Sequence, residues 1–140
     1  KYNQVHEENN LNAIKAKLHN QAYINLAKKI NLPSFKIIDQ FTPESLYYRY
    51  IKNEPQIIRG IHFETKAEDK YLSVAVGSII SRYGFLKAWE EMEQKYNLTF
   101  PKGSGDKVDI LAQEFVDRYG FERLGEVAKL HFKNTEKIRV

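Results

Sequence analysis

The sequence predicts an α/β fold in one domain spanning residues 1–140, with two parallel strands and several helices. Two short segments rich in β-branched residues, FKIID at 35–39 and QIIRGIHFE at 56–64, have the composition of buried strands. A helical segment follows each of them, and the order strand, helix, strand, helix indicates a parallel pair. Hydrophobic residues make up 42% of the chain, which is enough to bury one core.

The first helix is expected between about residues 9 and 31, where apolar residues recur at helical spacing and predict one face packed inward. These residues are Leu11, Ile14, Leu18, Ala22 and Leu26. After the strand at 35–39, a second helix is expected over FTPESLYYRYIK at 41–52, with Thr42 as its cap and Pro43 in its first turn. On this reading Asp39 is not needed as a cap.

One long helix is expected from about 67 to 96, directly after the second strand. Its first half is apolar or small on every side, which predicts burial. A glycine loop at 103–105 follows, Asp106 can cap a helix that ends at Tyr119, and residues 120–132 predict a last short helix that carries His131.

Composition excludes several classes of site and favours one class of partner. The chain has no cysteine, so it has no disulfides, thiolate nucleophiles or zinc-thiolate sites, which is compatible with a cytoplasmic protein. No apolar run is long enough to span a membrane, and the amino-terminal residues are too polar for a signal peptide. The net charge of +4 suits a polyanionic partner such as nucleic acid, but a charge of this size by itself more often belongs to an ordinary solvated surface.

Two acids, Asp39 and Glu68, are expected at the carboxyl ends of the two strands, which is the edge where α/β sheets bind ligands. Carboxylates held close together repel each other unless they share a proton or a cation, and without thiolates the fitting cations are Mg²⁺ and Mn²⁺. The alternative is that Glu68 and Asp69 only complement the dipole of a helix first turn. The apolar residues after them favour an enclosed site.

Several ordered motifs resemble type 2 ribonuclease H, and in particular its ribonuclease HIII branch. They are NLNAIKAKLHNQA, KIIDQF, KAEDKYLSVAVGSIISRYGFLK, FPKGSGDKVD and AKLHFKNTEK. The resemblance implies a ribonuclease H-like fold and an endonuclease that cuts the RNA strand of RNA/DNA hybrids with Mg²⁺ or Mn²⁺. It places Asp39 on the family's third catalytic carboxylate and Glu68 on the fourth, which is Glu in the HIII branch, whereas Asp69 falls on a variable position.

One departure from the family is large, because its first two carboxylates form an adjacent Asp-Glu pair and no such dipeptide occurs in this sequence. The resemblance therefore predicts that residues 1–140 are the carboxyl-terminal part of a catalytic domain, without its first strands and without the amino-terminal substrate-binding domain. In the complete enzyme, four carboxylates would hold two metal ions. This chain alone is expected to be inactive, and to associate with the amino-terminal remainder of the enzyme or with itself.

Four further residues are candidates for binding the hybrid. Lys66 can meet a phosphate or be a solvated lysine, and Lys102 with Ser104 lies in a PKGSG loop that can cradle phosphate or be a plain glycine turn. His131 can contact substrate, although a lone histidine among apolar residues is more often structural. Two other functions remain open, a ribonuclease HII that also cuts at single ribonucleotides and a non-catalytic nucleic-acid-binding module of the same fold.

Overall fold

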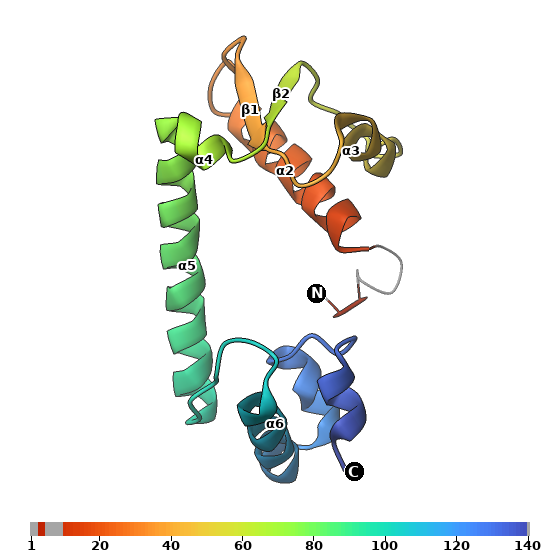
Figure 1. Ribbon diagram of the computed structural model, residues 1–140, viewed down its shortest axis with the longest axis vertical. Helices are drawn as coiled ribbons and strands as arrows, with labels where there is room; N and C mark the ends of the chain where they lie inside the picture. Colours follow the sequence, from red (N-terminus) through yellow and green to blue (C-terminus); the bar gives the residue numbers. More distant parts are fainter. Residues whose placement is uncertain (1–2, 5–9, 140) are drawn as a thin grey trace. The chain divides into compact units, whose positions relative to one another are not determined.

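The computed structural model describes residues 3–4 and 10–139 (Figure 1). In chain order its elements are α2 (Leu11–Ala27), β1 (Lys36–Asp39), α3 (Glu44–Tyr50), β2 (Ile61–Glu64), α4 (Ala67–Lys70), α5 (Leu72–Tyr96), α6 (Asp106–Tyr119), and the 3₁₀ helices η1 (Phe121–Glu126) and η2 (Lys133–Lys137). They form two compact units, one that runs to Tyr83 and one that runs from Gly84 and includes residues 3–4. That the chain is part of a larger catalytic domain stays a prediction.

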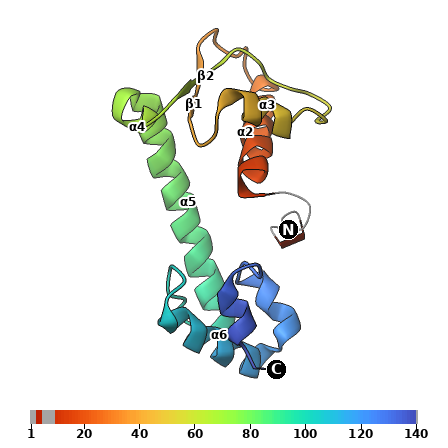
Figure 2. The ribbon, with the colours of Figure 1, turned by 45° about the vertical axis from the view of Figure 1, so that its right-hand side comes forward.

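The strands of the first unit form a two-stranded parallel sheet, as the sequence predicted. Its register places Asp39 beside Glu64, so both carboxyl-terminal residues lie at the same edge. Ala16 of α2 and Tyr47 of α3 pack with Ile38 and Ile61 of the strands in one buried cluster. Both helices therefore cover the same side of the sheet (Figure 2).

The second strand is shorter than the predicted 56–64, because a buried amide takes over part of its backbone hydrogen bonding. Asn20 of α2, which is 2% exposed, donates from Nδ2 to the Gln56 carbonyl at 2.8 Å. Its Oδ1 accepts from the Ile58 N–H at 2.9 Å. Gly60 then adopts a positive φ of 67°, and the ladder with β1 begins only at Ile61.

The first helix is also shorter than predicted, and it packs through a different face. It begins after Asn10, whose Oδ1 accepts from the Ala13 N–H at 2.9 Å, and ends at Ala27; residue 9 lies outside the described part of the chain. The predicted inward residues Leu11, Leu18 and Leu26 are exposed. The buried residues of α2 are Ala13, Ile14, Ala16, Asn20 and Ile24. Helical spacing was right, but the helix is apolar on more than one face, so the pattern did not identify the inward one.

The predicted helix over 67–96 is broken at Tyr71, which is extended with φ −127° and ψ 112°. The Tyr71 ring lies 5.8 Å from Phe35, so a tertiary contact accompanies the break. The predicted burial of the following apolar segment is wrong within the described chain, because Leu72 is 80% exposed, Ile79 70% and Ile80 64%.

Two predicted helix caps are also wrong. Pro43 occupies the cap position of α3 and Gly105 that of α6, and neither helix has a side-chain cap hydrogen bond. Thr42 is instead buried, and Asp106 is the first residue of α6. Asp106 therefore does not cap α6, and its negative charge complements the positive end of the helix dipole.

The second unit surrounds a core made of Tyr96, Leu98, Phe100, Phe115, Val116 and Leu124. Asn3 joins this unit, since its Nδ2 donates to the carbonyls of Gly125 and Ala128, each at 3.0 Å. The last helix predicted over 120–132 is replaced by η1 and a turn, with η2 beyond it. None of the described helices has both the length and the apolar composition needed to span a bilayer.

Candidate active site

Asp39 joins the end of β1 to the start of α4. Its Oδ1 accepts a hydrogen bond from the Ala67 N–H at 3.0 Å, and Ala67 is the first residue of α4. Helix starts have N–H groups without intrahelical partners, so Asp39 caps α4 from another element. The prediction that Asp39 has no capping role is therefore wrong: it does not cap α3, but it caps α4.

The other carboxylate oxygen of Asp39 remains open. Oδ2 accepts no hydrogen bond from any described residue, and the Asp39 side chain is exposed. One oxygen therefore fixes the orientation of the carboxylate, while the second, without a hydrogen-bond partner among the described residues, can bind a ligand. A hydrogen bond that restricts rotation in this way lowers the entropy cost of binding.

The prediction that Glu68 lies at the end of a strand is wrong, because β2 ends at Glu64 and a turn leads into α4. Glu68 lies in the first turn of α4, one residue beyond the N–H that Asp39 caps, so the two predicted site residues still belong to the same junction. Glu68 and Asp69 are both exposed. The enclosed rim expected around them is wrong within the described chain, because the first half of α5 is exposed and does not cover them.

Lys66 forms the turn that makes this junction possible. Its backbone is left-handed, with φ 53° and ψ 44°, a conformation that is uncommon for residues other than glycine. Its carbonyl accepts from the Asp69 N–H at 3.1 Å, which closes the first turn of α4. Backbone conformations of this kind cost about 1–3 kcal/mol and occur preferentially at functional sites. Lys66 lies at the turn beside the acids, and its contact with a phosphate stays a prediction.

Sequence reasoning missed a third carboxylate at this edge, that of Glu64. Its Oε1 lies 2.6 Å from Lys70 Nζ and its Oε2 lies 3.3 Å from His62 Nε2. The hydrogen bond from Lys70, followed by that from His62, lowers the pKa of Glu64 below its ordinary value. Glu64 is thus already paired. The six-residue separation from Lys70 is not a helical spacing, so no local pattern indicates this pair.

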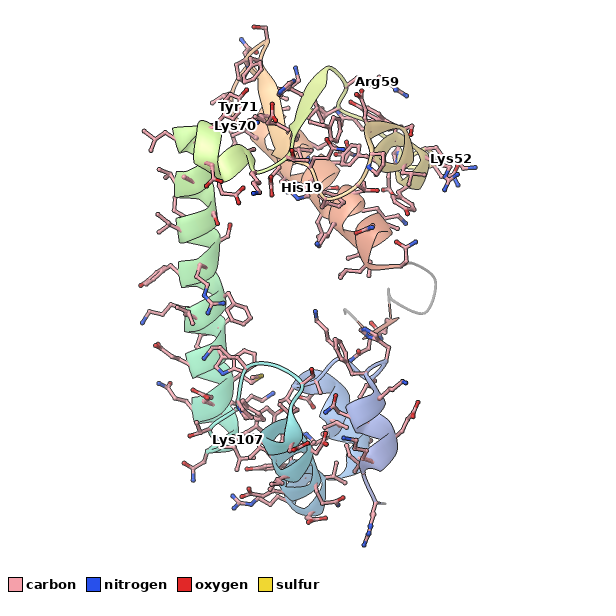
Figure 3. All side chains as sticks on the ribbon, in the orientation of Figure 1. His19, Lys52, Arg59, Lys70, Tyr71 and Lys107 are labelled. Atoms are coloured by element: carbon pink, nitrogen blue, oxygen red, sulfur yellow. The ribbon has the colours of Figure 1, made fainter. Side chains whose placement is uncertain are left out.

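His19 of α2 is a second residue that sequence reasoning missed (Figure 3). Its ring stacks on Phe41 with the centroids 5.4 Å apart. Desolvation lowers the pKa of His19, the charge of Lys15 lowers it further, and the negative charge of Asp39 opposes both. His19 therefore lies within electrostatic reach of Asp39, and its burial favours the neutral imidazole.

Asp39 and Glu68 present carboxylate oxygens, the ligands that Mg²⁺ and Mn²⁺ prefer. No group of three or more His, Cys, Asp or Glu side chains among the described residues is arranged to hold a metal ion. Two exposed carboxylates fit a partial cation site in which water or further ligands complete the shell.

The remaining predicted contacts, Lys102, Ser104 and His131, belong to the other unit. Lys102 Nζ lies 5.1 Å from the centre of the Trp89 ring, a cation–π contact. The Ser104 carbonyl accepts from Asn134 Nδ2 at 3.0 Å, which ties the glycine loop to η2. The loop also lines a hollow of about 670 Å³.

His131 does not lie on a final helix, as was predicted. It is exposed in the turn between η1 and η2, and its ring centroid is 4.7 Å from that of Phe132. η1 ends at Glu126 and η2 begins at Lys133, so no helix runs through this residue.

Comparison with known proteins gives one family and a consistent set of relatives. The model of the family Ribonuclease HII matches residues 1–135. Ribonuclease HIII of Bacillus cereus (strain ATCC 10987 / NRS 248) is 44% identical over 141 residues, and that of Listeria monocytogenes serotype 4b (strain CLIP80459) is 45% identical over 141 residues. These alignments cover 98% of this chain, but 45% and 46% of the two relatives.

Two crystal structures resemble the chain as well. Bst-RNase HIII in complex with Mn²⁺ has a TM-score of 0.93, and a mutant of the same protein has a TM-score of 0.92. Both are 39% identical to this chain, and the match covers 97% of this chain and 46% of theirs. The α/β fold and the resemblance described in the sequence analysis are confirmed. The chain spans less than half the length of the proteins it matches.

Proposed function

Because this chain belongs to the ribonuclease HII family, we propose that the protein containing it is an endonuclease that hydrolyses the RNA strand of RNA/DNA hybrids. The relatives that match 98% of the chain are named ribonuclease HIII. They are about twice as long as the chain, so the proposal concerns the whole protein.

The observation that carries the proposal is the hydrogen bond from the Ala67 N–H to Asp39 Oδ1, 3.0 Å long. It joins the strand that ends in Asp39 to the short helix that carries Glu68 in its first turn. Two carboxylates on separate elements are thereby placed at one junction, where one oxygen of Asp39 stays open. This arrangement supports a ligand site better than two isolated surface acids do.

In the proposed reaction, water attacks the phosphorus of the RNA strand and the bond from phosphorus to the 3′ oxygen breaks, which leaves a 5′-phosphate and a 3′-hydroxyl. Mg²⁺ or Mn²⁺ held by Asp39 and Glu68 would supply the positive charge that offsets charge developing at the phosphate. Asp39 contributes a carboxylate whose rotation the Ala67 N–H restricts. Glu68 contributes a second carboxylate from a helix turn whose start is fixed by the same hydrogen bond.

Lys66, Lys102, Ser104 and His131 are proposed to contact the hybrid. Lys66 supports this role through its left-handed backbone, which lies between β2 and the acids of α4. Lys102 and Ser104 lie in a loop held by Asn134, and His131 is exposed near the end of the same unit. Contacts of these kinds position the backbone of a nucleic acid without reading its sequence.

Within the family, the HIII branch is favoured over HII by the identity to the named relatives and by Glu at position 68. The test is to express the full-length protein and assay it with Mg²⁺ or Mn²⁺ on an RNA/DNA hybrid, on duplex DNA with one ribonucleotide, and on an RNA duplex. Cleavage of the hybrid alone supports ribonuclease HIII. Efficient cutting at the single ribonucleotide would support HII, and binding of the hybrid without cleavage would support a non-catalytic module.

A further inference from the structure

The unit that carries Asp39 also contains a hollow, which lies at the amino end of α2. This hollow of about 310 Å³ opens between the start of α2, the end of α3 and the turn after α3. Its lining residues are Asn10, Ala13, Lys17, Arg49, Tyr50, Lys52, Asn53 and Glu54. None of them belongs to the junction of Asp39 and Glu68.

The hollow is positively charged. Among the described lining residues, Lys17, Arg49 and Lys52 contribute +3 and the one acid, Glu54, contributes −1, which leaves +2. Glu54 Oε1 lies 3.5 Å from Lys17 Nζ, so this acid is paired with one of the cations. Arg49 and Lys52 form no ion pair with any residue that the structure describes. Two cations therefore remain available to an anion.

The lining also supplies neutral hydrogen-bond donors. Asn10 uses Oδ1 to accept from the Ala13 N–H, which leaves its Nδ2 as a donor. Asn53 has an amide and Tyr50 a hydroxyl. Asn10 is the cap of α2, a helix of 17 residues with no acid in its first turn, so the positive end of the helix dipole adds to the charge of the hollow. Glu7 and Glu8, which precede Asn10 in the sequence, lie outside the described residues.

We propose that this hollow binds a phosphate group, and that in function the phosphate belongs to the backbone of the bound RNA/DNA hybrid. A guanidinium, an ammonium group and amide donors around one concavity suit phosphate oxygens, and arginine binds them in a bidentate geometry. The identification of the phosphate as that of a hybrid rests on the proposed function. The binding of a phosphate group in the hollow does not rest on it, because it is inferred from the lining residues.

The position of the hollow on α2 agrees with such a role. His19 is nine positions beyond Asn10, or about 14 Å along the helix axis, and it lies within electrostatic reach of Asp39. A separation of that order corresponds to about four steps of a nucleic acid strand. The hollow would therefore hold the backbone at a distance from the cleaved bond and contribute to affinity rather than to the chemical step.

The test compares two double variants of the full-length protein. Arg49→Gln with Lys52→Gln removes both unpaired cations of the hollow, and Lys28→Gln with Lys29→Gln removes two exposed cations of the same unit outside it. Hybrid affinity is measured from low to high salt. We expect the first variant to bind about tenfold more weakly at low salt and to lose about 1 from the slope of log K against log salt. The turnover of the first variant at saturating hybrid should stay unchanged. The control variant should keep more of the wild-type slope of log K against log salt than the first variant does.

A second arm separates the hollow from the proposed function. Inorganic phosphate, against chloride at matched ionic strength, should raise the melting temperature of the wild type and of the control variant, and raise that of Arg49→Gln with Lys52→Gln less. Equal stabilisation of both variants would overturn phosphate binding in the hollow. If phosphate stabilisation depends on the hollow but the salt slopes of the variants are equal, the site takes free phosphate and the assignment to the hybrid is overturned. If the wild type binds no hybrid, the proposed function fails, and the phosphate arm alone decides the chemistry of the hollow.

Discussion

Asp39 is expected to have two separable roles, one in folding and one in catalysis, and two substitutions divide them. Oδ1 caps α4 through the Ala67 N–H at 3.0 Å, and Oδ2 is open to a cation. In Asp39→Asn, the amide oxygen can still accept from Ala67, but the negative charge is lost. In Asp39→Ala, both the cap and the charge are lost.

The magnitudes follow from these contacts. Asn and Asp are similar caps, so Asp39→Asn should lose only the charge–dipole part, about 0.3–1 kcal/mol. Asp39→Ala should lose the whole cap, about 0.5–2 kcal/mol. Each kcal/mol lowers the melting temperature of a protein of about 150–250 residues by about 2–4 °C, and less in a longer one. The rate of hybrid cleavage should fall in both variants. The loss should exceed the roughly 10–100-fold loss that follows removal of a group that only supports a metal ligand.

The assay is turnover of an RNA/DNA hybrid by the full-length protein in Mg²⁺ and in Mn²⁺, together with thermal unfolding of each variant. We expect the two variants to be equally inactive but unequally stable, with Asn closer to the wild type. Near-normal turnover of Asp39→Asn would refute the catalytic role. Equal destabilisation by Asn and Ala would refute the capping role.

Three further predictions concern single positions. Glu68→Gln should weaken hybrid cleavage and shift its metal dependence, whereas Asp69→Asn in the same helix turn should change turnover little; the opposite result would mean that the register along KAEDKY is wrong. Lys66→Gly should be more stable to urea than Lys66→Ala by up to about 1 kcal/mol, because the left-handed backbone at φ 53° costs alanine about 1–2 kcal/mol and the greater freedom of unfolded glycine offsets part of this. Equal stability of the two variants would contradict it. Hydrogen bonds, led by that from Lys95, lower the pKa of Glu126 to about 2, so the stabilisation they give is complete above about pH 4.5 and is lost as the pH falls towards 2. Unfolding of Glu126→Gln should therefore depend less on pH across that window than unfolding of the wild type, and an unchanged acid profile would show that the carboxylate is not stabilised in the fold.

The strands and their parallel pairing could be predicted because their signals are local. A β-branched run after Pro33 predicts β1, and the helix between the two runs requires a parallel crossover. The start of β2 could not be predicted in the same way. The residues before it have strand composition, but Asn20 of a distant helix binds the backbone of Gln56 and Ile58.

The candidate site also has features with a local signal in the sequence and features that depend on long-range contacts. Residue types and predicted strand ends made Asp39 and Glu68 candidates, and the resemblance implied a role for them. The bond that connects their elements joins residues 28 apart, and no local pattern indicates it. The sequence pattern also does not indicate the break at Tyr71, because the apolar run is continuous across it. Burial of Leu72 and Ile79 was inferred from their apolar character, yet burial requires a covering element, and the described chain leaves both exposed.

In the proposed function, Asp39 and Glu68 bind the catalytic cation of a hybrid nuclease. The most direct measurement is the anomalous diffraction of Mn²⁺ in crystals of the full-length protein, for the wild type and for Asp39→Asn. We expect a Mn²⁺ peak at inner-sphere distance from Asp39 Oδ2 and from the Glu68 carboxylate in the wild type, and a weaker or absent peak in the variant. A strong Mn²⁺ peak bound elsewhere, with both carboxylates free of metal, would contradict it.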